Sequence, residues 1–287
     1  MPFIVGFLIV FGSIITGYLE AGGKLGPLMQ VAEFIIIGGS MFGAIVIGSG
    51  FGGVKSAVAG VISLLKPKVF DKAKYRELME MLYALFDLAR REGILALEGH
   101  IDNPTNSEIF KRFPNIMANH HAVEFICDSL RMIVTGGIAD NEIERIMIDD
   151  LDVVAEEELI PSSIFATAGD SLPGFGIVAA VLGIVITMQA INGPLEQIGF
   201  KVAAALVGTF LGILLAYGVC NPIAKALENQ VKDAEAYMAV IRYSLDAFSR
   251  GYAAKICIEI ARRHVPPRYR STFEETEKFL SAKGTGG

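Results

Sequence analysis

Four long stretches of this 287-residue chain contain no Asp, Glu, Lys, Arg or His, and they limit the possible folds more than any other feature. They are residues 1–19, 34–54, 171–194 and 202–224. A helix that crosses a bilayer needs roughly 17–25 predominantly apolar residues, so each stretch is long enough to span. The sequence therefore predicts an all-α, polytopic membrane protein with four transmembrane helices and a helical cytoplasmic domain.

Positive charge is distributed unevenly around these stretches. The two short loops, residues 20–33 and 195–201, contain one lysine each, whereas residues 55–170 contain twelve Lys and Arg. Because Lys and Arg concentrate on the cytoplasmic side, the short loops are expected outside and both termini inside. The predicted organisation is residues 1–54 with two spans and a short periplasmic loop, 55–170 as a cytoplasmic helical domain, 171–224 with the last two spans, and 225–287 as a cytoplasmic helix and tail.

The segments outside the spans have the periodicity of amphipathic helices. Residues 71–98 place Leu78, Leu82, Leu85 and Leu88 on one face, which predicts a single helix packed on a core. Further helical segments are expected over residues 107–134, before Gly136 and Gly137; over 141–158, with Asn141 and Glu144 as a capping box; and over 223–263.

Several classes of protein are disfavoured by what the sequence lacks. The formal net charge of −6 and the absence of a dense basic run argue against nucleic-acid binding. No phosphate-binding loop, nucleophile motif or metal-ligand spacing occurs, so we predict no enzyme, no cofactor and no metal site. The cysteines Cys127, Cys220 and Cys257 are far apart and odd in number, which favours reduced, buried thiols.

The last two spans contain many small residues and none of the ionisable residues that a proton path requires. Acids within a span usually mark ion routes because their burial is costly, but Glu33 lies only at the outer edge of the second span. If the chain conducts ions, we expect another polypeptide to supply the carboxylate. The small residues stand at helix-packing spacing, at Gly174, Gly176, Ala179, Ala180 and Gly183, and at residues 203–205, Gly208 and Gly212.

Four segments together carry a family resemblance: GYLEAGGKLGPLMQVAEFIIIGG, RREGILALEGHIDNP, GDSLPGFGIVAAVLGIV and VGTFLGILLAYGVCNPIA. In this order they resemble the MotA family of flagellar motor stator subunits, over nearly the whole chain. The resemblance implies a pentamer of this subunit in the bacterial inner membrane, around two copies of a single-span partner, MotB, whose aspartate binds the ion. It also implies that ion flow turns the ring and that the cytoplasmic domain pushes on the rotor protein FliG.

Pro173 and Pro222 stand near the cytoplasmic ends of the last two spans. The resemblance implies that this pair couples ion binding to movement. A structural interpretation is also open, because a proline in the first turn of a helix loses nothing through its missing N–H, and Asp170 or Ser171 is placed to cap such a helix. The two interpretations are compatible.

Arg90 and Glu98 are the charges that, by the resemblance, face the rotor. Eight residues correspond to about 80° around a helix, so on one continuous helix the two would share a broad side. Charges on a helix usually form only a solvated face, and an isolated surface ion pair contributes about 0–1 kcal/mol. The neighbouring Arg91 and Glu92 leave open which charges act.

The expected ion is the proton, with Ala180 and Thr209 lining its path. Sodium-using relatives tend to place one threonine seven residues after the proline of the third span and another in the fourth, since hydroxyl oxygens suit a hard cation. Here the first position is Ala180, so one hydroxyl is missing. Thr209 has an alternative role, because a threonine in a membrane helix often bonds the carbonyl four residues earlier.

Two other functions are compatible with a membrane protein of this kind. ExbB and TolQ proteins also use proton flow through a partner's acid, but typically have three spans and drive a periplasmic protein. A secondary transporter should show a repeat between its halves and broken helices at the midplane, and the first two spans do not echo the last two.

Overall fold

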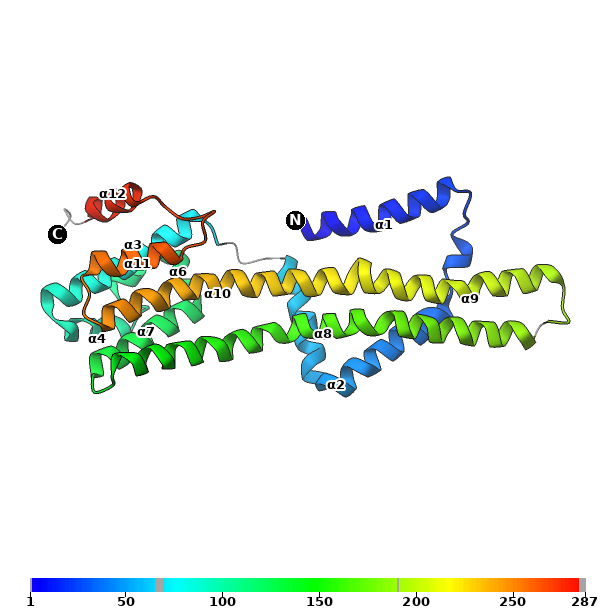
Figure 1. The fold of residues 1–287 in the computed structure, drawn as a ribbon, viewed down its shortest axis with the longest axis horizontal. Coiled ribbons are helices and arrows are strands. Elements are labelled where there is room, and N and C mark those ends of the chain that lie inside the picture. Colours follow the sequence, from blue (N-terminus) through cyan, green and yellow to red (C-terminus); the bar gives the residue numbers. More distant parts are fainter. Residues whose placement is uncertain (1, 66–69, 190, 284–287) are drawn as a thin grey trace. The chain divides into compact units, whose positions relative to one another are not determined.

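The computed structural model describes residues 2–65, 70–189 and 191–283, and all the regular elements in these ranges are helices (Figure 1). It confirms the all-α fold. The longer elements are α1 (Pro2–Glu20), α2 (Val31–Leu65), α3 (Lys72–Glu92), α7 (His120–Thr135), α8 (Asp140–Gln189), α9 (Leu195–Leu215), α10 (Asn221–Ser249), α11 (Ala254–His264) and α12 (Phe273–Lys283). The short ones are η1 (Gly26–Leu28), η2 (Ile94–Leu97), α4 (Glu98–Ile101), α5 (Glu108–Lys111), α6 (Pro114–Met117) and the π-helical turn η3 (Ala216–Cys220).

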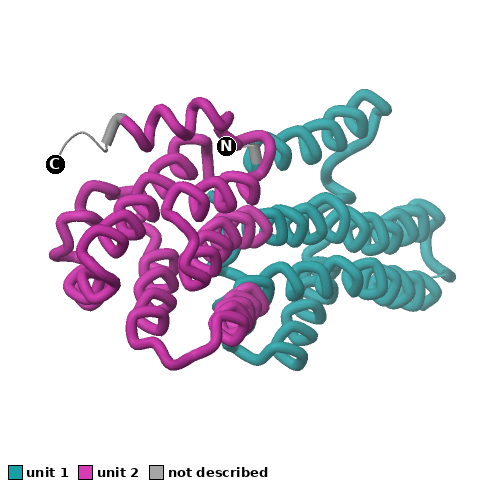
Figure 2. Tube along the Cα trace, turned by 60° about the vertical axis from the view of Figure 1, so that its left-hand side comes forward, with its two compact units in different colours: residues 1–67, 157–230 teal, residues 68–156, 231–287 magenta. Residues whose placement is uncertain are grey.

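The chain divides into two compact units (Figure 2). Unit 1 consists of Met1–Pro67 and Glu157–Gln230, and unit 2 consists of Lys68–Glu156 and Val231–Gly287. α8 and α10 contribute residues to both units. Where the bilayer ends along these helices stays a prediction, and residues 284–287 of the predicted tail lie outside the described residues.

Unit 1 contains the apolar helices. Four helices are long and apolar enough to cross a membrane, and each overlaps one of the four predicted stretches. Much of their apolar surface is exposed: Leu8, Ile47 and Leu195 are 69%, 89% and 84% accessible. In water such a surface would be unstable, whereas lipid tails or neighbouring membrane chains can cover it. The buried side chains that hold α2, α8, α9 and η3 together are Ile37, Ala168, Leu172, Ala179, Leu211, Ala216 and Cys220.

α2 is bent at one residue. Gly50 has φ 63° and ψ −176°, which is not helical. A side chain would be strained at this positive φ, and glycine is not. The bend at Gly50 therefore separates the first part of α2, which packs on α9, from the last part, where Leu64 packs against Ile223 and Leu227 of α10.

Unit 2 has a conventional apolar core. The predicted leucine face of α3 is confirmed, since Leu78, Leu82 and Leu85 are fully buried. Asp71 caps the helix by accepting a hydrogen bond from the Lys74 N–H at 2.9 Å. The core continues into α5, α6, α7, α10 and α11, through Phe110, Ile116, Ile126, Leu130, Val240, Ile241, Leu245, Cys257 and Ile258.

Three of the predicted helices are shorter than expected because of local breaks. α3 ends at Glu92, since Gly93 has φ 92°, so the single helix over residues 71–98 is wrong beyond Glu92. Residues 107–134 form three helices, with Pro114 starting α6. Gly251, at φ 78°, separates α10 from α11, so the continuous helix over residues 223–263 is also wrong.

α8 differs in the opposite direction, because it is one helix of 50 residues. The predicted end near residue 158 and the predicted new start at residue 171 are both wrong. The capping box is wrong too: Asn141 lies inside the helix, and Glu144 pairs with Arg250 at 2.8 Å. Pro161 and Pro173 are both tolerated inside α8, as happens where neighbouring helices and hydroxyls compensate for the missing N–H groups.

Candidate functional site

α8 and α9 run side by side in unit 1 and touch through glycines (Figure 1). A Cβ at Gly176 would lie 2.8 Å from the Gly208 carbonyl oxygen, and one at Gly212 would lie 2.7 Å from the Leu172 carbonyl oxygen. A real Cβ atom could not lie this close to a carbonyl oxygen. The two helices can approach to this distance only because both positions are glycine, so their backbones are in direct contact. The predicted close packing is confirmed at these positions, whereas Gly174 faces open space.

Ala180 and Thr209 both belong to this contact. The Thr209 Cα lies 3.4 Å from where a Gly176 Cβ would be, and the Ala180 nitrogen lies 3.1 Å from where a Gly208 Cβ would be. Both residues are partly exposed. Within the described residues, the Thr209 hydroxyl forms no hydrogen bond, in contrast to Thr187, which donates to the Gly183 carbonyl at 2.8 Å. The alternative role of Thr209, a bond to its own helix, is therefore not seen.

Glu33 joins the same contact from α2, which is not predictable from its place at the edge of a charge-free stretch. Its side chain is only 6% exposed. Its Oε2 atom lies 2.5 Å from where a Gly208 Cβ would be. Glu33 is the one charged residue between Lys24 and Lys55, and that isolation was the signal available in the sequence.

Pro173 lies well inside α8 and not in its first turn. The structural interpretation of Pro173 as a first-turn residue, capped by Asp170 or Ser171, is therefore wrong. Without an N–H at Pro173, the carbonyl of Gly169 loses its helical donor. At this level α8 meets Asn221, whose side-chain oxygen occupies the place that a Gly169 Cβ would need.

Pro222 directly follows Asn221, and the helix before it is irregular. Residues 216–220 form a π-helical turn, which closes with the Asn221 N–H donating to the Ala216 carbonyl. Such turns accompany prolines and recur at functional positions in helices. Because Asn221 packs on Gly169, it connects the helical irregularity at Pro222 to the one at Pro173.

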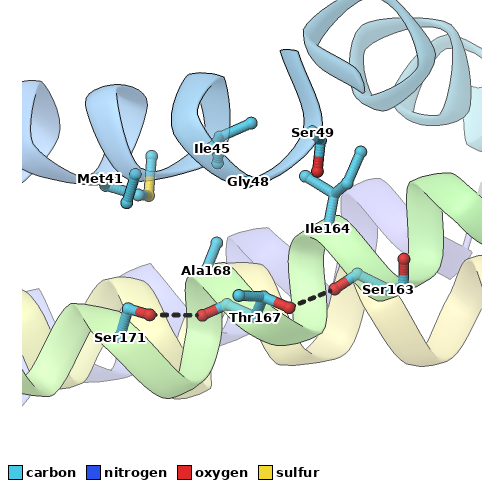
Figure 3. Close-up of a pocket in the computed structure, with 10 residues that line it drawn as sticks. Met41, Ile45, Gly48, Ser49, Ser163, Ile164, Thr167, Ala168 and Ser171 are labelled. Carbon is cyan, nitrogen blue, oxygen red and sulfur yellow. Dashed lines mark hydrogen bonds between the residues drawn. The ribbon is translucent and has the colours of Figure 1, made fainter. Parts of the chain in front are cut away.

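Figure 3 shows a pocket of about 180 Å³ between α2 and α8. Three hydroxyls follow α8 along it: Ser171 donates to the Thr167 carbonyl and Thr167 donates to the Ser163 carbonyl, at 2.8 and 2.9 Å. Ser163 in turn donates to the Ile160 carbonyl at 2.8 Å. All three protons are thus committed to the helix, so the hydroxyl oxygens can act toward the pocket only as acceptors.

Arg90 and Glu98 lie in unit 2, separated by the turn at Gly93. Arg90 is in the last turn of α3 and Glu98 begins α4, so the prediction of one shared helix face is wrong. Both side chains are exposed, and neither forms an ion pair within the part of the chain that the structure describes. Arg91, by contrast, pairs with Asp87 at 3.0 Å.

Three groups in unit 2 have pKa values raised by burial. Burial raises the pKa of Tyr83, and the nearby Asp87 carboxylate raises that pKa further. Burial also raises the pKa of the Cys127 and Cys257 thiols to about 11. All three cysteines are free and buried, which confirms their predicted burial; their reduced state stays a prediction.

Two family models match the chain. Motility protein A N-terminal matches residues 4–93, and the MotA/TolQ/ExbB proton channel family matches residues 117–239. Motility protein A of Salmonella typhimurium is 37% identical over 98% of this chain and 96% of that protein. Motility protein A of Escherichia coli has the same identity and coverage, and chemotaxis protein LafT of Vibrio parahaemolyticus is 36% identical over 96% of this chain and 97% of that protein.

Solved structures show a similar fold. The flagellar MotAB stator complex from Bacillus subtilis contains a chain with TM-score 0.76 and 24% identity, covering 96% of this chain and 98% of that one. A chain of C. jejuni MotAB gives TM-score 0.75 at 20% identity, covering 92% of this chain and 96% of that one.

Proposed function

Because the chain belongs to the motility protein A family, it is a stator subunit of the bacterial flagellar motor and not an enzyme, and we propose how it works. With a MotB partner it forms an ion channel that converts ion flow into torque on the rotor protein FliG. The solved MotAB complexes support MotB as the partner in a multi-subunit stator.

The observation that carries this proposal is the α8–α9 contact. The two backbones touch through glycines, while Ala180, Thr209 and Pro173 keep part of their surface open. A pair of helices packed this tightly moves as one body and offers a face to a further helix. We assign that face to the single span of MotB, whose aspartate binds the ion, and a ring of five subunits surrounds two MotB copies.

Pro173 and Pro222 couple the ion to movement in this proposal. Each lies where a regular helical hydrogen bond is missing, and Asn221 packs on Gly169 between them. A helix with a missing bond bends more easily than a regular one. A change of charge at the partner's aspartate can therefore bend α8 and α9 together at this level.

Arg90 and Glu98 form the rotor-facing site in this proposal. Arg90 is exposed and has no ion-pair partner in the described part of the chain, whereas the adjacent Arg91 is paired with Asp87. Charges on the rim of an interface set register and encounter rate more than affinity. That role suits a contact that must form and break repeatedly.

We place the chain in the bacterial inner membrane, surrounded by lipid, with both termini and unit 2 in the cytoplasm. The concentration of Lys and Arg in residues 55–170 and after residue 224 supports this orientation. The ion is the proton, because Ala180 provides no hydroxyl to complete a sodium site with Thr209.

The test is complementation of a motile strain that lacks its own stator genes. Expression of this chain with a single-span MotB partner should restore swimming, and the same pair with the partner's aspartate changed to asparagine should not. Expression of the chain alone should also fail. If the pair instead restores uptake across the outer membrane in a strain lacking ExbB and TolQ, and never restores swimming, the alternative function is correct.

A further inference from the structure

The Glu33 carboxyl group is buried, unlike that of an ordinary surface acid. Among the residues that the structure describes, its Oε2 is the buried side-chain oxygen without a hydrogen-bond partner. Buried polar groups are nearly always paired, and those that are not call for an explanation in function or in an unseen ligand. A carboxyl group in this state is a candidate binding site.

Residues of α8 and α9 form the space that this carboxyl group occupies. The Oε2 atom, the Ala179 Cβ and the Ala180 nitrogen lie 2.5, 3.0 and 3.1 Å from the position of a Cβ at residue 208. Any residue larger than glycine at position 208 would displace the carboxyl group. Glu33 thus occupies a niche that exists because Gly208 has no side chain.

No counter-charge faces this niche from the packed elements. Residues 171–189 of α8 and 202–215 of α9 contain no Asp, Glu, Lys, Arg, His, Cys or Tyr. The nearest charge before Gly208 along α9 is Lys201, about 10 Å away along the helix axis at about 1.5 Å per residue. The charged residues that flank Glu33 in sequence are Lys24, which lies before α2, and Lys55, which lies within it. A carboxylate here would be both unpaired and desolvated, which strongly favours the neutral acid.

We propose that Glu33 is a proton-binding group of this chain and part of the ion path beside the α8–α9 contact, an inference that rests on the proposed function. The carboxyl group is neutral while it lies against Gly208. Glu33 stands in the first turn of α2, so a small movement of that turn carries the carboxyl group toward water. Each subunit then brings a proton acceptor of its own in addition to the aspartate of the partner.

The transfer is a simple acid–base exchange. The Glu33 carboxylate oxygen takes a proton from hydronium, which leaves a water molecule, and the new O–H bond makes the side chain neutral. When the carboxyl group returns to water or meets another base, the O–H bond breaks and the proton moves to that base. No oxidant or metal takes part.

Infrared spectroscopy tests the protonation directly. The complex of this chain with its MotB partner, placed in lipid nanodiscs with ¹³C-labelled glutamate only in this chain, should show a carboxylic acid C=O band at neutral pH that carries the isotope shift. Glu33→Gln should remove that band. Glu196→Gln is the matched control, because Glu196 is exposed in the first turn of α9, and it should leave the band intact. A spectrum without any isotope-shifted acid band at neutral pH would overturn the proposal.

Proton flux tests the place of Glu33 in the path. In liposomes containing the same complex, Glu33→Gln should lower proton uptake several-fold. Glu33→Asp, which keeps the acid but shortens its reach, should lower uptake less. Equal uptake by Glu33→Gln and the unchanged complex removes Glu33 from the path. The infrared result does not depend on swimming, so loss of the proposed function and loss of this inference give different outcomes.

Discussion

At the scale of single residues, the structure separates two adjacent arginines that the sequence left equivalent. Arg91 is held by Asp87 at 3.0 Å, whereas Arg90 is exposed with its charge available. We predict that Arg90→Glu reduces swimming speed strongly, and that Arg91→Glu reduces it much less. The change should not unfold the protein, since exposed charges contribute about 0–1 kcal/mol to stability.

Swim-plate expansion and tethered-cell rotation measure this difference, with the amount of each variant in the membrane as the control. An equal loss for the two variants would mean that the position of the charge does not matter. Glu98→Lys should resemble Arg90→Glu, because Glu98 is also exposed at the start of α4. Loss of membrane insertion in either variant would instead make the residue structural.

A second prediction at this scale concerns pH. Hydrogen bonds from Arg262 and Arg263 hold the pKa of Glu259 below its ordinary value of 4.5. The folded-state pKa is thus lower than the unfolded one, so the ionised carboxylate stabilises the fold above about pH 4.5, and this gain disappears as the pH falls through the folded-state pKa. Glu259→Gln should therefore lower the melting temperature more at pH 7 than at pH 3. A variant that melts equally early at both values would show a steric effect instead.

At the scale of helices, Pro173 sets how easily α8 bends. Pro173→Ala restores an N–H at a position where a proline costs roughly 3 kcal/mol in a helix interior. We predict that this variant assembles normally and is at least as heat-stable as the unchanged protein, but turns the motor slowly. Tethered-cell rotation and thermal melting of the solubilised complex measure the two effects. A variant that loses assembly and rotation to the same degree would show that Pro173 is needed only for structure.

The glycine contact gives a second prediction for helices. Gly212→Val would force a side chain into the Leu172 carbonyl and the Gly176 backbone, with overpacking costs of about 1–3 kcal/mol. Gly174→Val is the matched control on α8, because nothing lies within 4 Å of that position. We expect the first variant to lower the melting temperature and abolish swimming, and the second to keep both near normal. Similar melting of the two variants would contradict direct contact of the backbones.

The spans could be predicted because burial in lipid demands long charge-free stretches, and these are visible in the composition. The leucine face of α3 was predictable for the same reason, since periodicity reports burial. The breaks at Gly93 and Gly251 were not, because a glycine inside a helical pattern is compatible with both a helix and a turn. Pro173 gives the opposite error, because the sequence predicts a helix start where α8 continues. Proline commonly begins helices in soluble proteins, but membrane helices tolerate proline within them.

The candidate site was only partly predictable, because it depends on which helices meet. The family resemblance points to Ala180 and Thr209, whereas the sequence places Glu33 at the edge of a span and gives no sign that its carboxyl group lies beside Gly208. A charge-free stretch ends at a charged residue by definition, so an acid buried near the end of a span is always predicted to lie outside it. Only the packing of α2 on α9 shows that the Glu33 carboxyl group reaches Gly208.

At the scale of the whole molecule, the ion that drives the motor should follow from the hydroxyls along the path. Thr209 supplies one unbonded hydroxyl and Ala180 supplies none, so a sodium ion would lack an oxygen ligand that it prefers, whereas a proton needs only a carboxyl group. We predict that cells swimming on this chain and its MotB partner stop when a protonophore is added and are unaffected by the removal of sodium.

Swimming speed under these two conditions measures the prediction, with a sodium-driven motor as the matched control that should respond in the reverse way. Ala180→Thr restores the missing hydroxyl beside Gly208. Since one added oxygen does not complete a coordination shell, we expect this variant to remain proton-driven. It should also swim more slowly, because the larger threonine side chain crowds the α8–α9 contact. Swimming that persists under the protonophore and fails without sodium would refute the proton assignment and would show that Thr209 and backbone carbonyls suffice to hold the larger ion.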